Sequence, residues 1–156
     1  MYALALSLLL SCRHPDPPAD PIVGNAAPAV SAAQLDGTPF TLAAHRGKPV
    51  VLVFWASWCG PCKRELPELT ELVEHYGERV VFVSINAGET APTAARAAAE
   101  WGISWPVVTD PDIQIQVDYR VDAIPTVVIV DADGVIRFRG LGVPDSPMAL
   151  LDGLLS

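Results

Sequence analysis

The sequence has no run of lysine or arginine, no apolar stretch long enough to cross a membrane, and only three cysteines. Its 10 basic and 18 acidic residues give a formal net charge of −8. This balance argues against a nucleic-acid partner, because phosphate binding needs clustered positive charge. Three cysteines, two of them in C-x-x-C spacing, do not make a disulfide framework. Apolar residues are plentiful, at 51% of the chain, which is enough for one domain with a core that needs no disulfide support.

The apolar run at residues 3–10 is far shorter than the roughly 20 residues that span a bilayer. It suits the apolar region of a signal peptide. The Leu-Leu-Ser-Cys that follows at 9–12 resembles the lipobox at which bacterial lipoproteins are cleaved and acylated on cysteine. We therefore expect residues 1–12 to be a lipoprotein-type signal peptide with Cys12 as the lipidation site. The alternative is a frayed apolar terminus with an incidental buried cysteine.

Residues 13–28 are rich in proline, which favours extended polyproline II backbone over helix or sheet. We interpret them as a semi-rigid tether that lifts the domain off a membrane. A disordered tail with no spacing role is the alternative. The domain itself is then expected at 29–156.

Two continuous apolar, β-branched runs, at 49–55 and 79–85, are typical of strands buried on both faces at the centre of a parallel sheet. The remaining pattern alternates strands with helices and ends in an antiparallel hairpin and a helix, which predicts an α/β sandwich. The other strands are expected at 29–34, 39–42, 107–109, 126–130 and 135–140. The helices are expected at 60–76, 90–101, 112–119 and about 146–155, with Thr90 and either Asp145 or Ser146 as caps.

Cys59 and Cys62 stand where the first buried run gives way to a helix. A cysteine in the first helical turn meets unpaired N–H groups and the positive end of the helix dipole, which favour its thiolate. Cys59 is therefore the expected nucleophile, and Cys62, one turn further on, can resolve a mixed disulfide. The alternatives are an inert disulfide or half of a zinc site. A zinc site needs about four ligands, and no second C-x-x-C or H-x-x-x-H occurs, so we expect no metal.

The Trp-Cys-Gly-Pro-Cys sequence at 58–62 resembles the thioredoxin superfamily, and the resemblance extends over residues 50–140. It implies a thioredoxin-like three-layer α/β sandwich with a central mixed β-sheet, an N-terminal β-hairpin and an inserted helix. Ile124-Pro125-Thr126 resembles the family's cis-proline loop, whose backbone pairs with an extended substrate. The resemblance gives substrate contacts to five residues: Trp58, Gly60, Pro61, Ile124 and Pro125. An ordinary trans proline at the start of a strand is the alternative.

Glu65 is the one charged residue on the apolar side of the predicted helix, one turn beyond Cys62. The apolar residues on that side are Leu66, Leu69, Leu72, Val73 and Tyr76. A half-buried carboxylate has a raised pKa and can exchange protons near neutral pH. We therefore expect Glu65 to be catalytic, as a proton shuttle to Cys62. Extension of its side chain to the rim is the alternative.

The surroundings of Glu65 differ from those of ordinary thioredoxin, which carries a buried aspartate at the position of Val53 and a lysine on a neighbouring strand. Residues 79–85 contain no lysine. Cys-Lys-Arg-Glu-Leu-Pro at 62–67 instead resembles the membrane-tethered TlpA/ResA-like group, in which a glutamate takes the acid role. His14, His45 and His75 are expected to be solvated and without a role.

The resemblance implies a thiol–disulfide oxidoreductase that reduces or exchanges protein disulfides on the periplasmic side of the cell envelope. Its cofactor would be the redox-active disulfide alone, its electron donor a membrane thiol protein, and its state a monomer held by a lipid anchor. Cytochrome c maturation is the commonest task of the family, although no residue here selects it.

Three alternatives stay open. A redoxin-type peroxidase would need proline and threonine where Leu52 and Ala56 stand. A copper-binding chaperone would need wider cysteine spacing and a histidine after His75. A structural lipoprotein would leave the dithiol unexplained.

Overall fold

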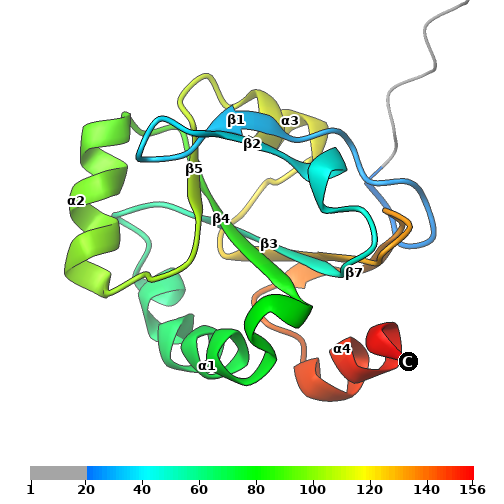
Figure 1. Cartoon of the computed structure of the whole chain (residues 1–156). Coiled ribbons are helices and arrows are strands. Elements are labelled where there is room, and N and C mark those ends of the chain that lie inside the picture. The colour runs from blue at the N-terminus through cyan, green and yellow to red at the C-terminus, as the bar shows by residue number, and fades with distance from the viewer. Residues whose placement is uncertain (1–20) are drawn as a thin grey trace, which may run out of the picture.

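The computed structural model describes residues 21–156, in which the two predicted buried runs lie in the middle of a five-stranded sheet (Figure 1). The strand order is β5-β4-β3-β6-β7. The strands are β3 (Val50–Trp55), β4 (Val81–Ala87), β5 (Val107–Asp110), β6 (Thr126–Val130) and β7 (Ile136–Leu141). β3, β4 and β5 run parallel, and β6 and β7 are antiparallel to their neighbours, so the sheet is mixed as predicted.

Two helices provide the crossovers between the parallel strands. α1 (Gly60–Tyr76) joins β3 to β4, and α2 (Ala91–Trp101) joins β4 to β5. α1 ends where expected, because Gly77 adopts a positive φ of 53° and its N–H closes the last turn on the Val73 carbonyl. β3 is buried along its whole length and is the central strand of the sheet. The segment between β3 and α1 therefore begins at the middle of the sheet.

The sheet is covered on both faces (Figure 1). α1 and α4 (Pro147–Leu155) pack on one face through Leu69, Leu72 and Leu151. The other face is covered by the antiparallel hairpin of β1 (Ser31–Ala33) and β2 (Pro39–Thr41), by a short 3-10 helix (Leu42–His45), and by α3 (Gln114–Asp118). The predicted three-layer arrangement, its N-terminal hairpin and its extra helix α2 are therefore confirmed.

The largest differences from the predicted elements lie at helix starts. α3 begins later than expected, because Ile113 is left-handed at φ +56° and the Asp110 carboxylate accepts the N–H groups of Ile115 and Gln116. The expected caps are wrong in detail: Thr90 and Ser146 occupy the N-cap positions, but neither hydroxyl bonds the helix backbone.

The segment 22–28, assigned above to the tether, is hydrogen-bonded to the domain. Gly24 N–H donates to the Ile136 carbonyl at 2.8 Å, and Ile136 N–H donates to the Asn25 carbonyl at 2.9 Å. Tyr119 adds a bond from its hydroxyl to the Pro28 carbonyl at 2.7 Å. Pro28 still offers its carbonyl as an acceptor, and the N–H groups of Gly24 and Ala27 are free to donate. Packing therefore begins ahead of the predicted boundary at residue 29. Residues 1–20, including Cys12 and His14, lie outside the described part.

Candidate active site

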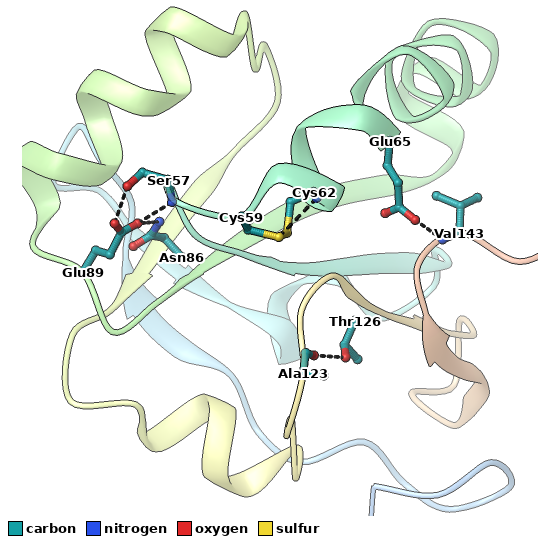
Figure 2. Close-up of a disulfide and its surroundings, with 9 residues drawn as sticks. All are labelled: Ser57, Cys59, Cys62, Glu65, Asn86, Glu89, Ala123, Thr126 and Val143. Carbon is teal, nitrogen blue, oxygen red and sulfur yellow. Dashed lines mark hydrogen bonds between the residues drawn. A yellow bond between two sulfur atoms is a disulfide. The ribbon is translucent and has the colours of Figure 1, made fainter.

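Cys59 and Cys62 form a disulfide where β3 leads into α1 (Figure 2). Cys59 is the N-cap residue of α1, and its sulfur accepts the Cys62 N–H at 3.2 Å. Both cysteines are almost fully buried, at 3% and 4% exposed. When the disulfide is reduced, the free N–H groups and the dipole of this helix end favour a thiolate on Cys59. Cys59 therefore lies at the helix position from which the sequence predicted it to act as the nucleophile.

The residues around the disulfide form an accessible rim. Trp58 is 72% exposed, although its neighbour Cys59 is buried. Gly60 and Pro61 are also exposed, at the first turn of α1. An exposed tryptophan beside a buried sulfur offers a large apolar contact to an incoming chain.

The Ile124–Pro125 peptide bond is cis, as expected from the sequence. Ile124 packs in the same apolar cluster as both cysteines, which places this loop beside the disulfide. The loop is held by Thr126, whose hydroxyl donates to the Ala123 carbonyl at 2.6 Å (Figure 2). The Pro125 carbonyl accepts the Gly142 N–H at 3.0 Å.

Glu65 is half-buried on α1, with its carboxylate on the inner side of the helix (Figure 2). One oxygen, Oε1, accepts the Val143 N–H at 3.2 Å. The other, Oε2, is buried without a hydrogen-bond partner among residues 21–156. Burial raises the pKa of the Glu65 carboxyl, the Val143 N–H opposes that shift, and the negative charge of Glu68 adds to it. The protonated form of the Glu65 carboxyl is therefore favoured to a higher pH than in a solvated glutamate, because its pKa is raised.

Glu65 and Cys62 line the same small cavity. Its volume is about 10 Å³, close to the space that a single water molecule needs. Its other lining residues include Trp55, Trp101 and Pro125. Glu65, Cys62 and the cis proline therefore line one cavity, and the sequence predicted that Glu65 lies near Cys62.

Sequence reasoning missed a second glutamate near the disulfide. Glu89 accepts hydrogen bonds from the Ser57 N–H at 2.8 Å, from the Ser57 hydroxyl and from the Asn86 side-chain amide at 2.8 Å (Figure 2). Burial opposes its ionisation, but these bonds and the nearby Arg96 together hold the pKa of Glu89 below its usual range. Ser57 lies in the turn that leads to Cys59. Asn86 lies near the end of β4, paired with Trp55 at the end of β3, and Glu89 follows β4. Polar residues at the ends of adjacent parallel strands could have signalled this cluster.

The histidines of the described chain lie away from the disulfide. His75 is exposed near the end of α1. His45 is half-buried rather than solvated, because its ring stacks on Phe40 at 5.0 Å between ring centroids. No group of three or more His, Cys, Asp or Glu residues within 21–156 is arranged to hold a metal ion. In the same part of the chain, no helix has both the length and the apolar character to span a bilayer.

The sequence is similar to a known protein family and to characterised relatives. The family described as Redoxin matches residues 22–153. The chain is 34% identical over 116 residues to the thiol-disulfide oxidoreductase ResA of Geobacillus thermodenitrificans. The matched residues cover 74% of this chain and 67% of that protein. It is 35% identical over 117 residues to the thioredoxin-like protein YneN of Bacillus subtilis, with coverage of 73% and 68%.

Solved structures of other proteins have the same fold. A Chlorobium tepidum protein described as thiol:disulfide interchange protein DsbE superposes with a TM-score of 0.78 and 26% identity, over 86% of this chain and 99% of that chain. The thioredoxin domain of a thiol-disulfide oxidoreductase from Bacteroides vulgatus gives the same TM-score, 0.78, with 22% identity over 86% of this chain and 99% of that chain. The fold of the domain is that of thioredoxin.

Proposed function

Since this chain belongs to the Redoxin family and is a TlpA/ResA-like thiol–disulfide oxidoreductase of the thioredoxin superfamily, we propose that it reduces or exchanges protein disulfides outside the cytoplasm. The observation that carries the proposal is the Cys59–Cys62 disulfide at the first turn of α1, beside the cis Pro125. The similarity to ResA, a thiol-disulfide oxidoreductase, and to DsbE, a thiol:disulfide interchange protein, supports it.

The reaction starts from the reduced dithiol. The Cys59 thiolate attacks one sulfur of a substrate disulfide, forms a mixed disulfide and releases the other substrate sulfur as a thiolate. The Cys62 thiol then gives its proton to the Glu65 carboxylate, and the resulting thiolate attacks the Cys59 sulfur. This step releases the second substrate sulfur and forms the Cys59–Cys62 disulfide, so two electrons pass to the substrate. The substrate thiolates take up protons from Glu65 and solvent.

Substrate docks as an extended strand on the backbone of Ile124, with Trp58, Gly60 and Pro61 as the facing rim. These rim residues are exposed, whereas the sulfurs are not, so contact along the rim precedes attack. A membrane thiol protein restores the dithiol, since the reaction consumes two electrons per turnover. The chain acts as a monomer, held at the periplasmic side of a membrane by a lipid on Cys12.

A disulfide within a Cys-x-x-Cys-His segment, the attachment site of c-type haem, is the proposed natural substrate. Cytochrome c maturation is the corresponding process. A synthetic Cys-x-x-Cys-His peptide disulfide should be reduced faster than the same peptide with its residues scrambled around the two cysteines. Equal rates for the two peptides would contradict the proposed substrate but would be compatible with a general disulfide reductase.

The redoxin-type peroxidase is the second candidate, because the family description does not separate the two activities. Leu52 and Ala56, at the positions where such a peroxidase needs proline and threonine, are both 0% exposed within the core. Neither supplies a hydroxyl for a peroxide, so reduction of hydrogen peroxide should be far slower than disulfide reduction.

Insulin-disulfide reduction by dithiothreitol, with metal analysis of the purified protein, tests the proposal. The wild type should accelerate the reaction and Cys59→Ser should not. Cys62→Ser should accumulate mixed disulfides, because attack proceeds without resolution. An inert wild type that carries copper would identify the chaperone instead, and equal trapping by both variants would overturn the assigned roles.

The proposed membrane anchoring through Cys12 can be tested separately. Cys12→Ser should give an unlipidated protein that separates from membranes, because the proposed lipid on Cys12 would then be missing. A variant that stays with the membrane at unchanged mass would contradict the lipobox assignment.

A further inference from the structure

The segment Leu141–Val143, at the end of β7, lies between the cis-proline loop and Glu65. Gly142 N–H donates to the Pro125 carbonyl at 3.0 Å, and the next N–H, of Val143, donates to Glu65 Oε1 at 3.2 Å. Leu141 is paired with Thr126 in the β6–β7 ladder. Two consecutive amides therefore join the proposed docking loop to the proposed proton carrier.

The observed position of the Glu65 carboxylate requires glycine at position 142. Gly142 is buried and has a φ of +77°, a backbone conformation that residues other than glycine rarely adopt. A Cβ atom at this position would lie 2.0 Å from Glu65 Oε1 and 3.1 Å from its carboxyl carbon. A side chain at 142 and the observed carboxylate position exclude each other.

We propose that Gly142 and Val143 are positioning residues that seat the Glu65 carboxylate in the cavity beside Cys62 and fix its place relative to the cis-proline loop. This inference rests on the proposed function of Glu65. Gly142 supplies the space, and the Val143 amide supplies one hydrogen bond that orients the carboxylate and leaves Oε2 toward the cavity. Because the same segment holds the Pro125 carbonyl, the docking backbone and the proton acceptor are set by one short piece of chain.

Few other charges act on this carboxylate. The residues that line the cavity include no titratable group besides Glu65 and the Cys62 thiol, and Glu68 is the charged neighbour that faces it from α1. A change in the pH dependence of resolution after substitution at 142 therefore reports on Glu65.

Gly142→Ala is the test, with Gly37→Ala as a matched control. Gly37 has a similar φ of +84° and lies in the turn between β1 and β2, but no atom lies within 4 Å of its added Cβ. In single-turnover reduction of a model disulfide, Gly142→Ala should slow resolution as much as Glu65→Gln does, about 10²–10⁴-fold. Alkylation of Cys59 should be unchanged, and the double variant should be no slower than Glu65→Gln. Gly37→Ala should resolve at the wild-type rate.

Two further measurements keep the inference separate from the proposed function. Carbon NMR of Glu65 should show its pKa falling toward 4.5 in Gly142→Ala as the carboxyl leaves the cavity. This readout holds even if Glu65→Gln proves active, which would overturn the catalytic role alone. If Gly142→Ala is too unstable to assay, the same change in a Glu65→Ala background should lower Tm only as much as Gly37→Ala does. An unchanged Glu65 pKa, or an equal Tm loss with and without the Glu65 side chain, would overturn the inference.

Discussion

Glu65 and Glu89 lie on opposite sides of the Cys59–Cys62 disulfide and differ in how their charges are satisfied (Figure 2). Both are half-buried and both accept a backbone N–H. Glu89 receives two further side-chain bonds and its pKa is lowered, whereas Glu65 receives no other and its pKa is raised. Burial alone therefore does not decide whether a carboxyl can carry a proton. The number of donors that meet its charged form decides it.

The largest effect is expected when Glu65 loses its ability to titrate. Glu65→Gln keeps the size of the side chain but should slow resolution about 10²–10⁴-fold, because the Cys62 proton has no acceptor. Cys59 alkylation should keep its rate. The measurement is single-turnover reduction across pH 5 to 9. Glu89→Gln is the matched control and should leave the rate–pH profile unchanged. A wild-type profile in Glu65→Gln would make Glu65 a structural residue.

Glu89 should matter for placing the nucleophile rather than for proton transfer. Glu89→Ala leaves the Ser57 and Asn86 donors without their acceptor, which costs about 1–3 kcal/mol of unfolding free energy. Because Ser57 lies in the turn before Cys59, alkylation of Cys59 should slow as well. Denaturant unfolding and iodoacetamide kinetics measure the two effects. Resolution that slows while alkylation does not would assign Glu89 the role given to Glu65.

The two glutamates should also give stability–pH curves of opposite slope. The folded-state pKa of Glu65 is raised, so its contribution to stability is present below about pH 4.5 and is lost as pH rises through the folded pKa. The folded-state pKa of Glu89 is lowered, so its contribution is present above about pH 4.5 and is lost as pH falls through the folded pKa. The difference in stability between wild type and each Gln variant, measured by urea unfolding from pH 3 to 8, should show both trends. Parallel curves would contradict the contrast.

The smallest expected effect comes from removing a single donor. Ser57→Ala deletes the hydroxyl that bonds Glu89 but keeps the Ser57 N–H bond. The pKa of Glu89 should rise toward its usual value, and stability should fall by roughly 0.5–1.5 kcal/mol. Carbon NMR of the Glu89 carboxyl measures the first and thermal unfolding the second. A Glu89 pKa that does not move would show that Asn86 and Arg96 suffice.

How much the sequence could predict depends on the range of the interactions involved. β3 and β4 were predictable because their apolar runs report burial on both faces, and α1 was predictable from Cys59 to Gly77 because its cap, its apolar side and its stop are all local. Glu65 was found in the same way, since helical spacing alone places it beside Cys62.

Features that depend on long-range contacts were harder to predict. Glu89 bonds Ser57, which is 32 residues away in sequence, so only the expected adjacency of two strand ends, and no local pattern, connects the pair. The docking of residues 22–28 also depends on the turn before β7, so proline content alone suggested a free tether. The delayed start of α3 reflects the Asp110 carboxylate, whose capping bonds reach five and six residues ahead.

The docking of Gly24 and Asn25 on Ile136 also fixes where the described chain joins the sheet. Ile136 is paired with Val130 at one end of β6, whereas the disulfide and Pro125 adjoin Thr126 at the other. Four residue steps of about 3.4 Å separate the two ends of β6 by roughly 14 Å. The described chain therefore joins the sheet at the end opposite to the sulfurs that the proposed function brings into contact with substrate.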